Sequence, residues 1–383
     1  MSAVMTTTRW HDPKRYLWLL GVPVMLLPML GGWLVDATGL SLFWWFMPLI
    51  VYLVVPVADL LVGEDRNNPP ESAVADLEKD RYYRWAVYAA VPMEYATLIW
   101  GAWVAGTESL AWWEYLGLAI SVGMVTGISI AVAHELGHKT DPFEQWLAKI
   151  ALAPTGYGHF YTEHNRGHHV RVATPEDPAS SRYGESFYAF LPRTIAGAMR
   201  SAWKIEKARM QRRGLPTWHW RNDALNAWAM TPILFGALIA AFGWIVLPYL
   251  LIQAVYGFSL LEVVNYLEHY GLCRKKLPSG RYERCQPTHS WNSNHVFSNV
   301  LLYGLERHSD HHANPLRGYE ALRHFEDSPQ LPNGYAGMIL LAYCPPLWFA
   351  VMNRKVRAHY GGDLTKANVV PRLRAKLGAP TPA

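Results

Sequence analysis

The apolar positions of this chain form long runs that contain no basic residue. Lys and Arg are absent from 16–65, 85–138 and 222–273. These stretches hold six apolar runs, each close to the ~20 residues that a helix needs to cross ~30 Å of hydrocarbon. The pattern predicts an all-α, polytopic membrane protein that forms one integrated domain. The six transmembrane helices are expected at 17–35, 40–61, 85–105, 111–133, 225–244 and 245–267.

The distribution of charge predicts the orientation. The short links within the first, second and third pairs of spans carry no Lys or Arg, so all 35 basic residues lie on the opposite side. By the positive-inside rule that side is the cytoplasm. We therefore expect both termini, the segments 134–223 and 268–334 and the tail 353–383 to be cytoplasmic. The run 335–352 contains Pro345 and Pro346 and precedes basic residues, so it is expected to be interfacial or re-entrant.

Composition supports a membrane protein over two soluble domains. Hydrophobic residues make up 51% of the chain and charged residues only 17%, with 18 Trp. The lipid bilayer is therefore an expected partner, and nucleic acid is not. The first span is too long for a signal peptide and has no clear cleavage site, so it is expected to stay in the mature protein.

Nine of the 16 histidines fall in four short clusters. Imidazole is the commonest nitrogen ligand of transition metals, and residues three or four apart share one helix face. An isolated pair is more often a satisfied pair of core histidines than a metal site, but four clusters in one chain predict metal binding. The candidate ligands are His134, His138, His164, His168, His169, His269, His308, His311 and His312.

The number and spacing of these histidines predict two metal ions. One tetrahedral ion uses at most four protein ligands, so nine exceed a single site. His164 and His169 are five residues apart and differ by about 140° on an α-helix. Either this helix breaks near Gly167, or His168 and His169 face different ions. All four clusters lie at one edge of the predicted bundle, whereas a metal transporter would place such groups near the bilayer midplane.

Five motifs carry a resemblance to a known family. They are GEDRNNPPE at 63–71, HELGHK at 134–139, EHNRGHH at 163–169, NYLEHYGL at 265–272 and ERHSDHH at 306–312. This set resembles the integral-membrane alkane 1-monooxygenase (alkane hydroxylase) family, and the likeness runs from about residue 59 to 314. That family lies within the histidine-box membrane di-iron superfamily of desaturases and hydroxylases. Glu306 departs from the pattern, because many relatives have glutamine before RHSDHH.

The resemblance implies a function and a cofactor. It implies that two non-haem iron ions and O2 convert medium- to long-chain n-alkanes to primary alcohols in the bacterial inner membrane. Imidazole ligands alone accept Zn, Cu, Fe or Ni, so the preference for iron rests on the family. A xylene-type hydroxylase and a fatty-acyl desaturase remain alternatives, which analysis of the products distinguishes. A metal transporter is a more distant alternative.

Electrons must come from another protein. The chain has no GxGxxG motif and no CxxC pair, and its three cysteines are too few for a rubredoxin site. The family's donor is rubredoxin, separate or fused, reduced by an NADH-dependent reductase. The end 377–383 is either an unstructured terminus or the start of a linker to such a domain. Basic residues expected to dock an acidic donor, or to contact anionic lipid, are Arg200, Lys204, Lys207, Arg209, Arg212, Arg213, Arg274, Lys275 and Lys276.

Carboxylates and slim apolar residues complete the predicted site. Metal-bound histidines generally donate the other ring N–H to a carboxylate or carbonyl. The candidate carboxylates are Glu135, Glu163, Asp177, Glu268 and Asp310, each also explicable as ordinary charge at a helix end or surface. Val51, Val54 and Ala58 lie on one face of the second span. They are candidates for lining a channel that admits substrate from the lipid, or simply contact lipid or another helix.

Overall fold

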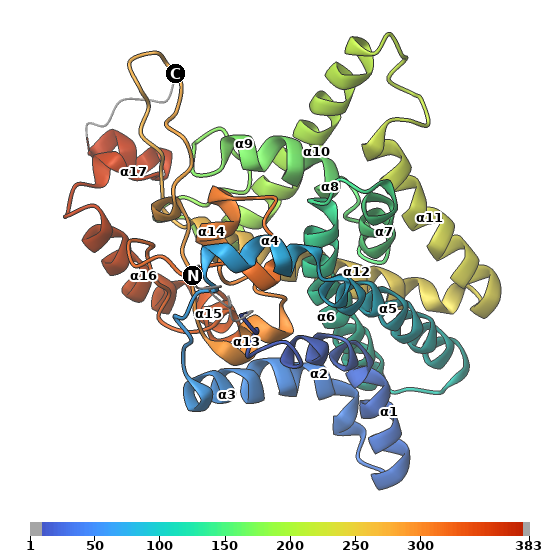
Figure 1. Cartoon of the computed structure of the whole chain (residues 1–383). Coiled ribbons are helices and arrows are strands. Elements are labelled where there is room, and N and C mark those ends of the chain that lie inside the picture. Colours follow the sequence, from blue (N-terminus) through green and yellow to red (C-terminus); the bar gives the residue numbers. More distant parts are fainter. Residues whose placement is uncertain (1–9, 378–383) are drawn as a thin grey trace, which may run out of the picture.

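The structure is a computed structural model that describes residues 10–377, so the tail residues 378–383 lie outside the described part. Within 10–377 every regular element is a helix and no β-strand forms, which confirms the all-α prediction. Figure 1 shows α1, α2 and α3 at the bottom of the view, α5, α6, α11 and α12 on the right, α16 and α17 on the left, and α8, α9 and α10 towards the top.

Five helical segments have the length and hydropathy to cross a membrane. They correspond to five of the six predicted spans. The third predicted span lies in α5 (Arg81–Thr107), which is 27 residues long but is not one of the five. Arg81 and Arg84 near its N-terminus and the buried Glu94 reduce its apolar character. The five segments are Leu17–Thr38, Ser41–Val62, Trp112–Gly137, Asp223–Phe242 and Trp244–His269.

The second span is not a uniform α-helix. It contains the 3-10 helix η3 (Ser41–Trp45), α2 (Phe46–Leu49), the π-helix η4 (Ile50–Val54) and α3 (Val55–Val62). Pro48 and Pro56 flank the π-helical turn, and proline lacks the N–H that completes an α-helical ladder. The wider turn changes which side chains of this span share one face. The first span is similarly composite, with η1 (Leu17–Gly21), η2 (Pro23–Leu26) and α1 (Leu27–Thr38).

The close packing of α6 (Trp112–Gly137) on α12 (Leu247–His269) positions two of the histidine clusters. A Cβ atom added to Gly123 would lie 2.8 Å from the carbonyl oxygen of Gln253, and one on Gly127 would lie 2.9 Å from that of Gly257. Small residues allow the two backbones to approach closely, as in other membrane helix pairs. Because both helices end in histidines, this packing sets the spacing between the first and third clusters.

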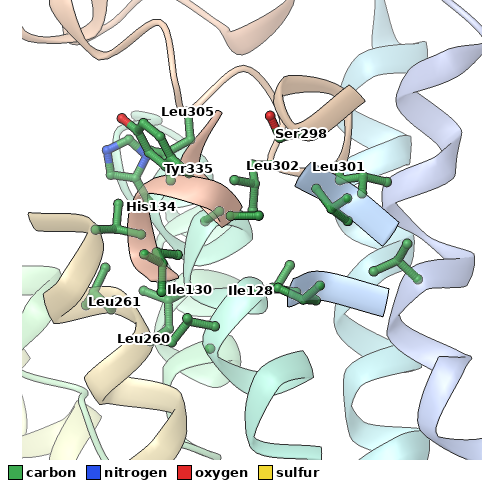
Figure 2. A pocket seen from close by; sticks show the side chains of 18 of the residues that line it. Ile128, Ile130, His134, Leu260, Leu261, Ser298, Leu301, Leu302, Leu305 and Tyr335 are labelled. Carbon is green, nitrogen blue, oxygen red and sulfur yellow. The ribbon is translucent and has the colours of Figure 1, made fainter. Parts of the chain in front are cut away.

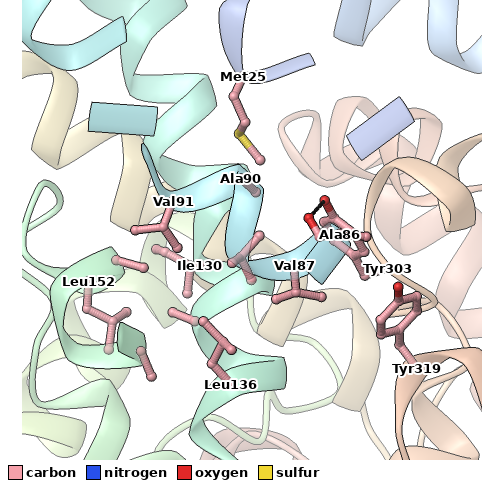
Figure 3. Close-up of a cluster of buried hydrophobic side chains, with 14 of the residues drawn as sticks. Met25, Ala86, Val87, Ala90, Val91, Ile130, Leu136, Leu152, Tyr303 and Tyr319 are labelled. Atoms are coloured by element: carbon pink, nitrogen blue, oxygen red, sulfur yellow. Dashed lines mark hydrogen bonds between the residues drawn. The ribbon is translucent and has the colours of Figure 1, made fainter. Parts of the chain in front are cut away.

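The other side of α6 packs against α5 in a large buried core. Figure 3 shows the α5 residues Ala86, Val87, Ala90 and Val91 between Met25 on one side and Ile130 and Leu136 of α6 on the other. Small side chains on α5 again permit close helix contact. This core holds the histidine-bearing end of α6 in place, and it extends to Leu261 of α12.

The helices outside the five spans and α5 form what we call the upper layer. Two of them, α15 and α16, are bent by 120° at the break between them, where Pro345 begins α16. The upper layer and its connections contain α4 (Glu71–Lys79), α7 (Pro142–Leu152), α8 (Phe160–Glu163), π-helix η5 (His164–His168), α9 (His169–Arg171), α10 (Phe187–Arg212), α13 (Val296–Leu301), α14 (His308–Ala313), α15 (Tyr335–Ala342), α16 (Pro345–His359) and α17 (Pro371–Lys376), with 3-10 turns η7 (Pro287–His289), η8 (Tyr319–Ala321) and η9 (Leu364–Lys366). The span Asp223–Phe242 is α11, and the span Trp244–His269 begins with the 3-10 turn η6 (Trp244–Val246).

Candidate metal centre

The nine predicted histidines come from five helical ends or turns. His134 lies in the last turn of α6 and His138 caps its C-terminus, while His269 is the last residue of α12. The π-helix η5 carries His164 and His168, and α9 begins at His169. The third box lies on α14, which begins at His308. Rigid helix ends therefore present all nine imidazoles, which is the arrangement that keeps ligand geometry fixed.

The structure gathers these nine histidines into two adjacent groups. In each group, one nitrogen from every ring lies within 4.8 Å of the corresponding nitrogen of all the others. The two groups adjoin, since the ring centroids of His169 and His312 are 4.5 Å apart. The five-histidine group contains His134, His138, His164, His169 and His311, and the four-histidine group contains His168, His269, His308 and His312.

The Nε2 atoms face one another at the separation expected of ligands to a shared ion. His134 and His311 have Nε2 atoms 2.9 Å apart, and those of His169 and His164 are 3.0 Å apart. In the other group, the Nε2 atoms of His312 and His308 are 2.8 Å apart. Two nitrogens at 90° on one ion, each about 2.1 Å from it, lie about 3.0 Å apart. The donor set therefore fits a metal ion in each group.

The chemical state of the imidazoles also fits metal binding. His269 is fully buried, and neither of its ring nitrogens has a hydrogen-bond partner among the described residues. A buried polar atom without a partner is costly, and a metal ion would satisfy it. Burial, with the neighbouring histidines, holds the pKa values of His164, His311 and His312 well below the usual range. The neutral imidazole that results is the form that binds metal.

The π-helix accounts for the separation of two neighbouring ligands. The spacing of these histidines left two alternatives, a helix break near Gly167 or ligands to two different ions. The helix continues as the π-helix η5, and His168 and His169 belong to different groups. A π-helical turn is wider than an α-helical one, and such turns are frequent at functional sites. It brings the Nε2 of His169 to 3.0 Å from that of His164 although five residues separate them.

Two of the five predicted carboxylates contact histidines of the four-histidine group. Asp177 Oδ2 lies 2.9 Å from Nδ1 of His168, and Glu268 Oε2 lies 3.1 Å from Nε2 of His308. Burial opposes the charged form of Asp177, yet the interaction with His168 and the hydroxyl of Ser180 lower its pKa to about 2. A carboxylate at this position fixes the tautomer of His168, with Nε2 facing the group.

The other three predicted carboxylates contact basic side chains. Glu135 pairs with Lys139, Glu163 accepts a hydrogen bond from Arg171 at 2.6 Å, and Asp310 pairs with Arg317 at 2.8 Å. Each carboxylate adjoins a histidine in the sequence. However, each of these carboxylates points towards its basic partner and not towards the imidazoles. Among the described residues these three carboxylates form no hydrogen bond or ion pair with a histidine ring, so their role beside the metal stays a prediction.

An apolar cavity ends at both histidine groups. His134 of the five-histidine group and His308 of the four-histidine group both lie in its wall, together with Tyr335 and Glu268. Figure 2 shows His134 and Tyr335 at one end of the cavity and Ile128 and Leu260 towards the other. Most of the remaining wall is aliphatic: it includes Val24, Leu27, Met47, Ile50, Val55, Ile130, Leu261, Leu301, Leu302, Leu305 and Ile339.

The second span lines this cavity with a different face from the one predicted. Val51 is part of the wall, as expected, but Val54 is 47% exposed and neither Val54 nor Ala58 is part of it. Met47 and Val55 take their place, four residues before and after Val51. The cause is the π-helical turn at Ile50–Val54, which replaces the spacing of three and four that an uninterrupted α-helix would give.

The predicted donor-docking residues do not form one surface. Lys207, Arg212 and Arg213 are exposed near the end of α10, and Lys275 and Lys276 are exposed in the loop after α12. Figure 1 shows these two regions on opposite sides of the upper layer. Arg274 is only 8% exposed, because its guanidinium donates to the carbonyl oxygens of Val170 and Glu283 inside the protein.

Tyr335 is a contact residue that the sequence did not identify. Its hydroxyl donates to Glu268 Oε1 at 2.7 Å, and its backbone N–H donates to Oε1 of the buried Glu306 at 2.9 Å. Tyr335 begins an apolar helix, so only its distance from Glu268 distinguishes it from the other core tyrosines. Glu306, where many relatives have glutamine, therefore lies beside the cavity wall, and the histidine groups form in its presence.

Comparisons with known proteins agree with this architecture. The fatty acid desaturase family model matches residues 110–342. An alkane 1-monooxygenase of Pseudomonas putida is 47% identical over 375 residues, which cover 98% of this chain and 93% of that protein. Alkane 1-monooxygenase 1 of Alcanivorax borkumensis is 47% identical over 363 residues, covering 95% and 90%. The hydroxylase component of xylene/toluene monooxygenase from Pseudomonas putida is 25% identical over 319 residues, covering 81% and 82%.

The fold and the histidine groups define a multi-pass helical membrane protein of the fatty acid desaturase type, with a histidine-rich metal centre. Sequence identity above 45% to alkane 1-monooxygenases over nearly the full length then specifies the family within this type. The chain belongs to the alkane 1-monooxygenase family, a family of oxidoreductases, as its motifs predicted.

Proposed function

We propose that this protein hydroxylates the terminal methyl group of medium- to long-chain n-alkanes, with O2 as co-substrate. The observation that carries the proposal is the apolar cavity whose wall includes His134 and His308, one residue from each histidine group. An n-alkane offers no group for hydrogen bonding, so only apolar walls and shape can hold it. The cavity therefore suits a substrate that enters from lipid and places one end beside the metal centre.

The metal in this proposal is iron, with one ion in each histidine group. A methyl C–H bond gives acids and bases nothing to act on, so a redox metal must supply the reactive chemistry. When bound, the two irons would activate O2 for oxidation of this bond. The overall reaction consumes an alkane, O2, two electrons and two protons, and yields a primary alcohol and water. The nine histidines would hold the ions, and the Asp177 carboxylate fixes the orientation of His168.

The protein's own contribution is to position the substrate and exclude water. Aliphatic side chains such as Leu302 and Ile339 surround the chain, while His134 and Tyr335 border the reacting end. Holding the reacting atoms in place replaces a bimolecular encounter by a pre-oriented one. A terminal position is selected because the cavity admits the chain end first, whereas an internal methylene would require a bent chain.

Electrons in this proposal come from rubredoxin, reduced in turn by an NADH-dependent reductase. The chain supplies no flavin, nicotinamide or four-cysteine site of its own by sequence motif. The metal centre lies on the cytoplasmic side of the bacterial inner membrane, where such a soluble donor is available. The support is the basic charge of the segments on this side.

The test is product analysis with membranes that contain the full chain. Octane, O2, rubredoxin, its reductase and NADH are supplied, and alcohols are identified by gas chromatography with mass spectrometry. We expect 1-octanol from the wild type, none from His138→Ala, and wild-type amounts from His219→Ala, a histidine outside both groups. Iron is measured in the same preparations.

Two outcomes would contradict the proposal. Failure of an iron-loaded preparation to oxidise alkanes of any length, with benzylic alcohol formed from xylene or an alkene formed from a fatty acyl substrate, would favour the other branches of the superfamily. Unchanged octanol formation by His138→Ala with reduced iron content would separate the histidine groups from catalysis.

A further inference from the structure

A cleft on the surface of the upper layer carries an excess of positive charge. Five basic side chains and two acidic ones, Glu176 and Asp177, lie in its wall. We call it the basic cleft and define it by the five basic residues Arg171, Arg182, Arg193, Arg200 and Lys204. It lies between the segment that follows α9 and the middle of α10, and it shares no lining residue with the apolar cavity.

Three of these five cations form no ion pair within the described residues. Arg171 pairs with Glu163 at 2.6 Å and Arg193 with Glu185 at 2.7 Å, so their charges are neutralised locally. The charged groups of Arg182, Arg200 and Lys204 form no ion pair or hydrogen bond with any residue in 10–377. Arg200 and Lys204 are exposed, one turn apart on α10, whereas Arg182 is half-buried. A group of unpaired cations in a concave surface attracts an anionic ligand or an acidic protein surface.

One residue of the basic cleft, Asp177, contacts a histidine of the metal centre. Asp177 lies in the cleft wall, is 1% exposed, and has its Oδ2 atom 2.9 Å from Nδ1 of His168. The opposite nitrogen of this ring, Nε2, faces His312 in the four-histidine group at 3.3 Å. One carboxylate and one imidazole therefore separate the cleft from a metal position. Electron tunnelling weakens steeply with distance, so this short hydrogen-bonded connection favours electron entry here.

We propose that the basic cleft is the docking site of the acidic one-electron donor, and that electrons reach the metal centre through Asp177 and His168. This inference rests on the proposed function. Two donor molecules dock in turn, each loses one electron from its reduced iron, and the two electrons together complete the reduction of O2 to the alcohol oxygen and water. Electron-transfer encounters are small and guided by charge, which fits a cleft with three unpaired cations.

One feature distinguishes the basic cleft from the cations at the end of α10: Arg212 and Arg213 have no comparable connection to a histidine in the described residues. The loop of Lys275 and Lys276 instead borders the cleft, because Lys276 lies over the ring of Tyr282, whose hydroxyl donates to Glu176 of the cleft wall at 3.0 Å. Anionic lipid is the other ligand that a basic cleft of this kind attracts. The connection through Asp177 is what favours a redox protein, because a lipid head group gains nothing from proximity to His168.

The experiment compares charge reversal in the basic cleft with charge reversal at the end of α10. Full-length protein in nanodiscs carries either Arg200→Glu with Lys204→Glu or, as the matched control, Arg212→Glu with Arg213→Glu. All four side chains are exposed, so neither double variant disturbs the core. Turnover of octane is measured over a range of rubredoxin concentrations at low and high salt, and binding of rubredoxin to the nanodiscs is measured separately.

We expect the cleft variant to raise the apparent KM for rubredoxin about tenfold at low salt, with little change in kcat and a smaller effect at high salt. The control variant should change the KM by less than about twofold. Single-turnover oxidation by enzyme reduced with dithionite should be equal in all three proteins, because it bypasses docking. Arg182→Gln should give a KM increase in the same direction as the cleft variant.

The opposite results would overturn the docking site. An unchanged KM in the cleft variant, or a larger effect at Arg212 and Arg213, would place the donor elsewhere. An effect that disappears in nanodiscs without anionic lipid would make the basic cleft a lipid site. The binding measurement does not depend on turnover: loss of alcohol formation by the wild type would refute the proposed function alone, while unchanged rubredoxin binding by the cleft variant would refute the docking site alone.

Discussion

His168 and His169 are neighbours in the chain, yet their Nε2 atoms belong to different histidine groups. The Nε2 of His168 lies 3.3 Å from that of His312, whereas the Nε2 of His169 lies 3.0 Å from that of His164. Consecutive residues on a helix point about 100° apart, so one turn serves two ions. The boundary between the two metal positions therefore passes through a single peptide bond at the end of η5.

This relationship predicts that the two histidines can be separated by mutation. His168→Ala should weaken the four-histidine site and His169→Ala the five-histidine site, because each removes a ligand from one group only. Iron per chain should fall from about two towards one in each single variant, and further in the double variant. Iron is measured by plasma mass spectrometry. The mean number of imidazoles per iron is then measured by X-ray absorption, and it should be higher in His168→Ala than in His169→Ala.

A complete loss of iron in either single variant would mean that the two groups bind metal only together. Equal imidazole numbers in the two variants would contradict the assignment of His168 and His169 to separate ions. Thermal unfolding of each variant is the control for loss of structure.

A second prediction concerns the carboxylate behind His168. Asp177→Asn removes the charge that holds the His168 ring N–H, while it keeps the size of the side chain. Loss of such a contact typically weakens metal affinity ~10–100-fold. Glu163→Gln is the matched comparison, since Glu163 precedes His164 but contacts Arg171. A chelator titration should show a clear loss for Asp177→Asn and a change of less than about threefold for Glu163→Gln. Equal losses would show that proximity in sequence matters more than the observed contact.

The spans and the set of candidate ligands were predictable because each leaves a periodic or clustered signal in the sequence. Long apolar runs identified the five segments whose length and hydropathy allow them to cross a membrane. The spacing within each histidine cluster identified residues on one helix face. The grouping of the ligands was not predictable. It depends on which imidazoles from α6, η5, α12 and α14 meet in space, and the sequence contains no record of those long-range contacts.

Local departures from α-helical geometry account for most other differences. The π-helical turn Ile50–Val54 moved the cavity-lining face from Val54 to Val55, and no propensity scale detects one extra residue in a turn. Arg274 resembles its exposed neighbours Lys275 and Lys276 in sequence. It is buried because two carbonyl oxygens meet its guanidinium, which is again a long-range contact.

The two valines of the second span provide a matched test of the cavity. Val51→Trp should fill the cavity and reduce turnover of long alkanes relative to short ones, whereas Val54→Trp places the same side chain outside the cavity wall. Each methylene that an apolar pocket no longer accommodates costs ~1–3 kcal/mol, so the ratio of dodecane to hexane turnover should fall about tenfold or more in Val51→Trp. Competition between alkanes in one reaction measures this ratio. Identical profiles for the two variants would remove Val51 from the substrate path.

Glu320 predicts a dependence of stability on pH that is separate from catalysis. Burial, together with the nearby Glu135, raises the pKa of Glu320 from 4.5 to about 8. The folded protein therefore retains this proton at pH values where the unfolded chain has lost it. Between about pH 4.5 and pH 8 the folded state binds more protons, so the free energy of unfolding must fall as the pH rises through this window.

Glu320→Gln should remove this part of the pH dependence, because the amide stays neutral at every pH. The wild type should lose on the order of 2 kcal/mol more than the variant between pH 5 and pH 8. Thermal unfolding in detergent at both pH values, with metal content held constant, measures the difference. Glu326→Gln is the control, because the Glu326 side chain is 81% exposed. The pKa of Glu320 would have to be close to its ordinary value if wild type and Glu320→Gln lost stability equally, since only a carboxyl that titrates differently in the folded and unfolded states links folding to pH.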